Sequence, residues 1–357
     1  MDRRDDNTGR QQTLGKPLPH YVCRGLPPPA SSVTAVCFAD IDTESYMIFG
    51  TDCGQVIHWS LDTYRSQLVY DSQHNSRVQQ LIVTDDEDFG HLLLSQFKNG
   101  FIDVYDRQMT VKRSLNISDL SFCKCFLYTS ADCQSKYLAF VPKSDDKSIE
   151  IMNFTDKQTM VTIEQISDKT KNGYPLAVHL TQFDTNNSKC DKILVIIGYE
   201  SGLLLVFKVD PNVCDYQLVA QLKCFETIIT GLDFNRDRNT GICCSVENVI
   251  SVWTLTTNDD KTAVSLSLKK DLIVTNSGLT CCVIRSDGRV FACAGTDGCI
   301  RLFALKSLKP LAVADIHKKT VECLNFSHKL STKNMKILLA VGSQDKTITL
   351  WDFYNNL

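Results

Sequence analysis

The sequence has no long apolar run. No stretch of its 357 residues approaches 18 consecutive apolar side chains, roughly the length that a membrane-spanning helix needs. The first 20 residues, MDRRDDNTGRQQTLGKPLPH, also lack the apolar core of a secretory signal peptide. We therefore expect a protein of the cytoplasm, with the nucleus as a second location, and no attachment to a membrane.

The sequence also lacks an excess of charge of either sign. Its 38 Lys and Arg residues nearly balance 41 Asp and Glu residues, which gives a formal net charge of −3. Proteins that bind a phosphate backbone or an anionic membrane surface usually carry clustered positive charge. Direct binding to nucleic acid is therefore not expected.

Paired cysteines are missing although the chain has 16 of them. No two are spaced as C-x-x-C, and Cys123 with Cys125 has no second ligand pair at a zinc-like distance. Several others, such as Cys37, Cys243 and Cys293, lie inside apolar runs. Free cysteine packs as a small apolar side chain, so we expect reduced, buried thiols and no metal site.

Motifs of catalytic and cofactor sites are absent as well. The sequence has no G-x-x-x-x-G-K-[ST], no G-x-G-x-x-G after a strand, no G-x-S-x-G and no H-E-x-x-H. Carboxylates cluster in DDED at 85–88 and at 145–146, where solvated loop charge is the ordinary explanation. We expect no catalytic residue, no cofactor and no enzymatic activity.

A weak internal repeat is present, and it predicts the fold. Each copy has a turn, then a strand in which aliphatic residues alternate and a large side chain follows. The copies are residues 50–61, 96–106, 142–154, 198–209, 245–255, 295–305 and 342–353. Their large side chains, spaced 46 to 55 residues apart, are Trp59, Tyr105, Met152, Phe207, Trp253, Phe303 and Trp351.

This spacing suits four-stranded units, so the sequence predicts an all-β, seven-bladed β-propeller over residues 20–357. The repeats would end near residues 61, 107, 154, 209, 255, 305 and 353. The sequence stops just after the third strand of the last blade, and residues 20–24 (HYVCR) offer the missing outer strand. Residues 1–19 are expected to be a flexible tail.

Insertions in the repeat mark loops. Residues 85–90, 184–191 and 327–336 fall between the first and second strands of their blades, which predicts that all three lie on one rim. The longest irregular stretch, 164–174, precedes the fourth blade. It is either a docking loop or a tolerated surface insertion.

The last blade holds His317, Asp345 and Trp351, a set that resembles the hydrogen-bonded tetrad of WD-repeat proteins. In that family the histidine leads into the blade, the aspartate lies in the turn before the third strand, and the tryptophan lies on that strand. The resemblance implies a structural role rather than catalysis. Val341 stands where the family usually has serine or threonine, so an incomplete network is expected.

The other blades keep less of the tetrad. Asp297 and Asp146 retain the turn aspartate, while Phe303, Trp253 and Trp59 are expected only as structural side chains of their repeats. His74 is either the corresponding histidine of the second blade or an ordinary loop histidine.

The amino-acid sequences of several repeats are similar to those of one WD-repeat family, that of guanine nucleotide-binding protein subunit beta-like protein 1 and ASTRA-associated protein 1. The similarity lies in residues 198–207, 229–253, 295–326 and 338–354. It implies an adaptor without catalytic activity that acts with the triple-T cochaperone in maturing kinases related to phosphatidylinositol 3-kinase. Those cochaperone subunits and kinases would be its partners.

Two other functions remain open for a propeller with these residues. A substrate receptor of a cullin ubiquitin ligase is the main alternative, but the W-D-x-R signature is missing because Phe353 and Tyr354 follow Trp351-Asp352. A ligand site in the central channel is supported only by the fact that one fold can carry many different binding sites. A G-protein γ subunit is not an expected partner, since residues 1–30 contain five prolines and no heptad pattern.

Overall fold

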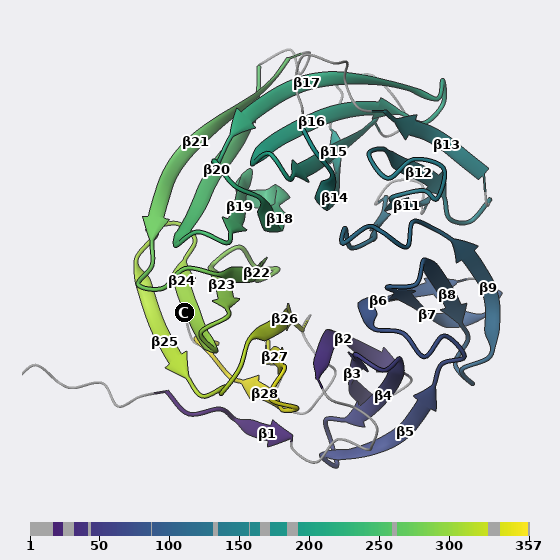
Figure 1. The fold of residues 1–357 in the computed structure, drawn as a ribbon, viewed down its shortest axis with the longest axis vertical. Coiled ribbons are helices and arrows are strands. Elements are labelled where there is room, and N and C mark those ends of the chain that lie inside the picture. Colours follow the sequence, from purple (N-terminus) through teal and green to yellow (C-terminus); the bar gives the residue numbers. More distant parts are fainter. Residues whose placement is uncertain are drawn as a thin grey trace, which may run out of the picture.

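The described part of the chain forms seven four-stranded antiparallel sheets arranged as a ring (Figure 1). The computed structural model describes residues 17–23, 32–41, 44–86, 88–130, 135–156, 158–164, 172–183, 192–258, 263–327 and 336–355. Six sheets follow the order of the chain, and the seventh has the order β1-β28-β27-β26. We number the blades 1 to 7 from β2, so that blade 7 contains both ends of the fold.

In each blade the first strand lies nearest the central axis and the fourth lies on the rim (Figure 1). The first strands are β2 (Val33–Ile41), β6 (Val78–Asp86), β10 (Phe126–Thr129), β14 (Pro175–Phe183), β18 (Ile229–Asn235), β22 (Leu279–Ile284) and β26 (Val321–Phe326). The second strands are β3 (Glu44–Thr51), β7 (Gly90–Phe97), β11 (Lys136–Phe140), β15 (Lys192–Tyr199), β19 (Thr240–Ser245), β23 (Val290–Gly295) and β27 (Leu339–Ser343).

The third strands carry the large side chains of the repeat. They are β4 (Gln55–Ser60), β8 (Phe101–Tyr105), β12 (Ile149–Asn153), β16 (Leu203–Asp210), β20 (Val249–Thr257), β24 (Cys299–Ala304) and β28 (Ile348–Trp351). The fourth strands are β5 (Arg65–Asp71), β9 (Val111–Asn116), β13 (Gln158–Ile163), β17 (Asp215–Lys223), β21 (Val264–Ile273), β25 (Pro310–Asp315) and β1 (Tyr21–Cys23). One 3-10 turn, Arg236–Arg238, joins β18 to β19, and no described segment forms a helix able to cross a membrane.

Burial explains the composition of these strands. Every residue of β19 and β23 is buried, because second strands are covered on both faces by neighbouring blades. Such strands read as continuous apolar runs. The rim strand β5 is almost entirely exposed, which matches its polar sequence RSQLVYD.

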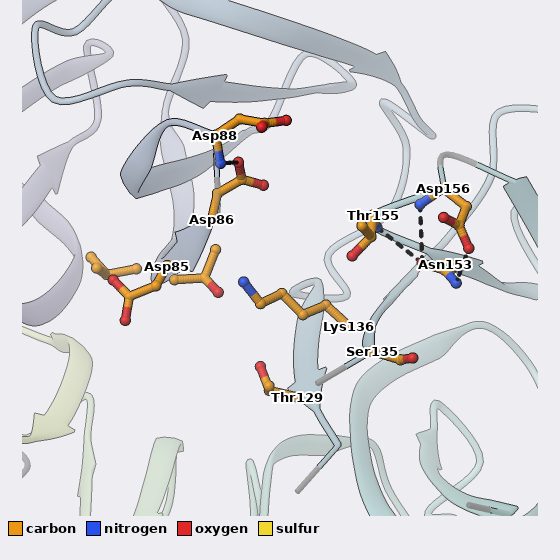
Figure 2. Close-up of a pocket in the computed structure, with 11 residues that line it drawn as sticks. Asp85, Asp86, Asp88, Thr129, Ser135, Lys136, Asn153, Thr155 and Asp156 are labelled. Carbon is orange, nitrogen blue, oxygen red and sulfur yellow. Dashed lines mark hydrogen bonds between the residues drawn. The ribbon is translucent and has the colours of Figure 1, made fainter. Parts of the chain in front are cut away.

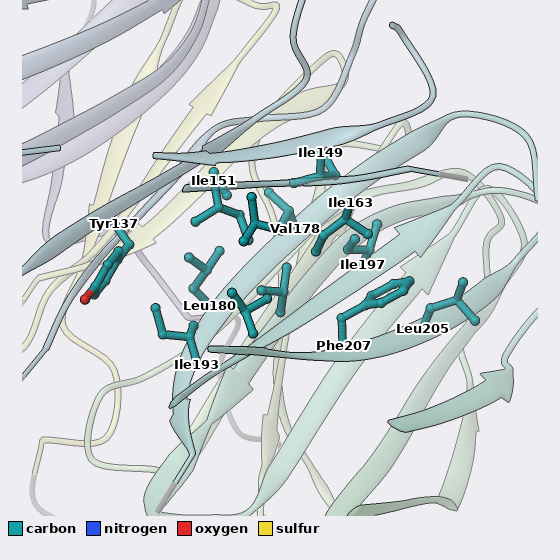
Figure 3. Close-up of a cluster of buried hydrophobic side chains, with 14 of the residues drawn as sticks. Tyr137, Ile149, Ile151, Ile163, Val178, Leu180, Ile193, Ile197, Leu205 and Phe207 are labelled. Atoms are coloured by element: carbon teal, nitrogen blue, oxygen red, sulfur yellow. The ribbon is translucent and has the colours of Figure 1, made fainter. Parts of the chain in front are cut away.

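Apolar contacts between blades form the core. One cluster joins blade 3 to blade 4, where Ile149 and Ile151 pack against Val178, Leu180 and Ile197 (Figure 3). The same arrangement recurs around the ring in separate clusters. The core is therefore divided among the junctions between blades, and each blade depends on its neighbours.

Threonines near the start of three first strands add a polar link between blades. The hydroxyl of Thr34 donates to the carbonyl of Val78 at 2.6 Å, and that of Thr280 donates to Val321 at 2.6 Å. Thr230 does the same to Leu279 at 2.8 Å. Each bond ties one first strand to the next.

The N-terminal strand closes the ring, as the sequence predicts. In β1, Tyr21 pairs with Leu350 and Cys23 with Ile348 of β28, and the amide of His20 donates to the Leu350 carbonyl at 2.7 Å. The Tyr21 ring also stacks on Tyr64 of blade 1, with centroids 4.7 Å apart. This strand therefore connects blade 7 to blade 1. Most of the expected tail, residues 1–16, lies outside the described residues.

A buried arginine of blade 6 holds the segment that follows β28. Arg285, in the turn between β22 and β23, is 1% exposed and pairs with Asp287 at 2.9 Å. Its guanidinium also donates to the carbonyls of Phe353 (3.0 Å) and Tyr354 (3.2 Å), just beyond β28. The hydroxyl of Tyr354 in turn donates to Leu311 of β25 at 2.7 Å. Blade 6 thus anchors the segment that follows the last strand.

Candidate functional site

Blade 7 contains a continuous polar network around His317. Its Nδ1 lies 3.1 Å from Oδ2 of Asp345, and its Nε2 lies 2.9 Å from Oγ1 of Thr349. The indole N–H of Trp351 donates to the same Thr349 hydroxyl at 2.7 Å. The network runs from the loop before β26, through the turn after β27, to β28. It joins these three parts of the blade.

The expectation of an incomplete network was therefore wrong. Val341 of β27 pairs directly with Thr349 of β28, so the hydroxyl that the family carries on the second strand is supplied from the opposite residue. Thr349 and Trp351 are two residues apart on one strand and so project from the same face. This spacing brings the hydroxyl within reach of both the indole and the imidazole.

Electrostatics make this network a poor proton-transfer site. Burial lowers the pKa of His317, and this effect outweighs the nearby Asp345 carboxylate. Burial alone would raise the pKa of Asp345, but hydrogen bonds from the Thr347 hydroxyl and the Lys318 amide hold it below its usual range. The imidazole is neutral at pH 7 with both nitrogens bonded, and its side chain is 1% exposed. These hydrogen bonds hold the loop before β26 against the rest of the blade.

Blade 2 contains a second network of the same plan. Nε2 of His74 lies 2.7 Å from Oδ2 of Asp103, which also accepts from the Tyr105 hydroxyl at 3.0 Å. Asn99 of the turn lies 3.4 Å from Nδ1 of His74. Asp103 precedes Tyr105 by two residues, just as Thr349 precedes Trp351. His74 is therefore the counterpart of His317, an interpretation that the sequence left open.

In blade 6 an asparagine of the preceding loop stands in place of the histidine, and an arginine stands two residues before the large side chain. Asp297 of the turn pairs with the guanidinium of Arg301 on β24 and accepts from Asn276 of the preceding loop at 2.8 Å. Burial would raise the pKa of Asp297, but these bonds lower it to about 2. Phe303, again two residues after Arg301, stacks on Phe291 with centroids 5.1 Å apart. Loop, turn and third strand are joined here too.

The predicted large side chains share one position in the blade. In six blades they immediately follow a register shift between the third and fourth strands, such as Val252/Trp253 in blade 5. Trp253 is fully buried and stacks on Phe234, and a side chain at Gly241 would clash with its ring. Trp59 is only half-buried and packs near Tyr21, 6.2 Å away.

Other titratable groups lie apart from these networks. Asp233, whose pKa is raised to about 6 by burial, lies 3.4 Å from His179, whose pKa burial lowers to about 3. The Asp233 carboxylate accepts from the amides of Phe234 and, across the blade boundary, Ile284. Cysteines that the structure describes are unpaired thiols, and burial raises the pKa of Cys23 to about 12.

An acidic hollow of about 760 Å³ lies between blades 2 and 3 (Figure 2). Asp85, Asp86 and Asp88 line one side and Asp156 the other, and Figure 2 shows the amino group of Lys136 pointing into the space between them. Within the described ranges no three or more His, Cys, Asp or Glu side chains are placed to hold a metal ion. The predicted loop 184–191, residues 328–335 of the predicted loop 327–336, and residues 165–171 of the long insertion lie outside the described residues.

A protein-family model described as "WD domain, G-beta repeat" matches residues 267–303 and 308–352. The chain carries WD40 repeats. The two matched segments end at residues 303 and 352, each within one residue of the end of a third strand, β24 or β28. The WD40 repeat therefore runs from one rim strand through the three inner strands that follow.

Two curated relatives cover nearly all of this chain. It is 28% identical over 341 residues to "Guanine nucleotide-binding protein subunit beta-like protein 1" of Mus musculus, with 95% of this chain and 97% of the relative covered. It is 23% identical over 387 residues to "ASTRA-associated protein 1" of Schizosaccharomyces pombe, with 95% and 99% covered. The resemblance inferred from the blades is thereby confirmed.

A solved structure supports the fold of these WD40 repeats independently. The computationally designed Ika8 protein superposes with a TM-score of 0.57, covering 91% of this chain and 97% of that one. Because the sequence identity is only 17%, the comparison concerns the fold alone.

Proposed function

We propose that this chain is an adaptor without catalytic activity, which acts with the triple-T cochaperone in maturing kinases related to phosphatidylinositol 3-kinase. The similarity to ASTRA-associated protein 1 along 95% of the chain is the observation that carries this proposal. It extends over all seven blades, so the likeness concerns the whole scaffold. We place the protein in the cytoplasm and the nucleus.

The arrangement of polar groups supports an adaptor. The histidines and carboxylates that resemble catalytic pairs, His317 with Asp345 and His74 with Asp103, lie inside networks that join loops to strands. Their ring nitrogens and carboxylate oxygens are used in holding the blades. The loops and rims that these networks position are the parts left for binding partners.

The N-terminus supports an adaptor over a G-protein β subunit. Residues 1–30 contain five prolines and no heptad pattern, and Tyr21–Cys23 is a rim strand of blade 7. Pairing with a γ subunit needs a coiled-coil helix before the propeller. We therefore propose protein partners other than a γ subunit.

Depletion with rescue tests the function. We expect that depleting the protein lowers the steady-state abundance of these kinases several-fold while unrelated kinases stay constant, and that the wild-type chain restores them. Purification of the tagged chain should recover triple-T subunits. Normal kinase abundance after depletion would contradict the proposal. Recovery of a cullin adaptor in place of the cochaperone would favour the substrate-receptor alternative.

A further inference from the structure

The segment 118–125, which leads from blade 2 into blade 3, displays two large apolar side chains to solvent. Leu120 is 66% exposed and Phe122 is 69% exposed. Lys98 lies over the Phe122 ring, 3.8 Å from its centroid. Large exposed apolar groups held beside charged ones are typical of protein-binding surfaces.

This segment is held tightly by blade 2. Nζ of Lys98 donates to the carbonyls of Asp119, Leu120 and Ser121 at 3.1 to 3.2 Å. Gln79 of β6 also donates to the Ser121 carbonyl, at 3.2 Å. The exposed side chains therefore stand on a fixed backbone, which lowers the entropy lost when a partner binds.

Just before β10, the side-chain amide of Gln96 bonds the backbone where a neighbouring strand would normally pair with it. Nε2 of Gln96 donates to the Cys123 carbonyl at 2.9 Å, and its Oε1 accepts from the Cys125 amide at 2.7 Å. Ser121, Cys123 and Cys125 are buried as a result, while the residues between them, Phe122 and Lys124, face outward. β10 consequently starts only at Phe126 and is the shortest of the first strands.

Beside Phe122 lies a hollow of about 350 Å³. Its lining comes from three blades and consists of Arg77, Gln79, Lys98, Phe122, Lys124 and Glu322. Blade 7 contributes Glu322, which pairs with Arg77 at 2.6 Å and accepts from Gln344. Blades 2 and 3 contribute the rest.

The hollow carries more positive than negative charge. Glu322 is engaged by Arg77, and the exposed Asp119 lies near Lys98. Lys124 is exposed, and among the described residues it forms no ion pair. Three cations and one carboxylate line a site in a chain whose net charge is −3. The charge favours a partner segment that brings carboxylates.

We propose that Leu120 and Phe122 form an anchor for an extended partner segment in which an apolar side chain is flanked by Asp or Glu. The apolar side chain covers the Phe122 ring, and the carboxylates bind Lys124, while the ammonium of Lys98 adds positive charge nearby. This proposal shares one assumption with the proposed adaptor function, namely that the partner is a protein. Aromatic side chains on a fixed backbone are the residues that usually dominate such interfaces.

A peptide selection tests this anchor directly. The probe is a phage-displayed library of random 12-residue peptides, selected on the immobilised full-length chain. Binding of the selected peptides is then compared among the wild type, Phe122→Ser and Lys124→Glu. Phe89→Ser is the matched control, because Phe89 is another exposed phenylalanine beside a lysine, Lys112, in a different loop. Melting temperatures verify that each variant is folded.

The proposal predicts peptides rich in Asp, Glu and apolar residues. Their affinity should fall about tenfold or more in Phe122→Ser, fall in Lys124→Glu with loss of salt dependence, and stay constant in Phe89→Ser. Peptides that bind Phe122→Ser as well as wild type, basic peptides, or no enriched peptides would overturn it. So would a dimer of the chain that Phe122→Ser dissociates in sedimentation, because a second copy would then be the occupant.

The same variants separate this proposal from the adaptor function. If the wild type recovers no cochaperone subunit while peptides still depend on Phe122, the adaptor function fails and the anchor stands. If wild type and Phe122→Ser recover the cochaperone equally and no peptide depends on Phe122, the anchor fails and the adaptor function stands.

Discussion

Replacing Thr349 with valine is the sharpest test of how the last blade is held. Valine keeps the shape of threonine but removes the hydroxyl that joins Nε2 of His317 to the indole N–H of Trp351. Both partners are buried, and leaving a buried polar group unpaired costs about 1–3 kcal/mol. We expect Thr349→Val to lower the free energy of unfolding by about 2–4 kcal/mol, which corresponds to a melting temperature lower by about 3–5 °C.

The assay is urea unfolding followed by tryptophan fluorescence, with thermal melting as a second measurement. Val341→Thr combined with Thr349→Val moves the hydroxyl to the directly opposite residue of β27, where WD repeats usually carry it. This double variant should recover part of the loss, because the hydroxyl again lies near the two buried nitrogens. If Thr349→Val changed stability by less than about 0.5 kcal/mol, typical of neutral surface changes, the network would not hold the blade.

Three further changes test other parts of the ring. Arg285→Leu should cost about 3 kcal/mol in urea unfolding, because it leaves Asp287 and two carbonyls without a buried partner, while Arg289→Leu, at an exposed site, should be neutral. Deleting Tyr21–Cys23 should lower the melting temperature and promote aggregation, because the edge of β28 is exposed. Burial lowers the pKa of His58 to about 4 against about 6.5 when unfolded. Stability should therefore fall as pH drops from 6.5 towards 4, and His58→Gln should remove about 3 kcal/mol of that loss.

Each of these three has a result that would contradict it. Equal stability of Arg285→Leu and Arg289→Leu would mean that the segment after β28 is held without the guanidinium. An unchanged melt after removal of Tyr21–Cys23 would exclude closure by β1. A pH profile that His58→Gln leaves unaltered would show that the imidazole is protonated freely in the folded protein.

The architecture could be predicted from the sequence because six of the seven blades need the same kind of residue at the same position. The residue after the register shift in the third strand must be large and apolar, and both Tyr105 and Met152 meet that demand although neither is tryptophan. The N-terminal strand could be predicted because the last repeat lacks its fourth strand. Prolines on both sides of residues 20–24 also suit a strand at the edge.

The polar networks could be predicted only in part. Thr349 and Asp103 occupy the position two residues before the large side chain, whereas the family pattern places its hydroxyl on the second strand. A search for the usual residue at the usual strand misses a partner that comes from the facing strand. The side-chain pairing by Gln96 is harder still, because no local pattern indicates that an amide will replace a backbone ladder.

Reconstitution with purified components tests the adaptor proposal most directly. The full-length chain is mixed with purified triple-T subunits at micromolar concentration and analysed by size-exclusion chromatography with light scattering. We expect a stable complex that contains the propeller and that forms without added nucleotide or metal. Separate elution of the chain and the cochaperone would contradict the account.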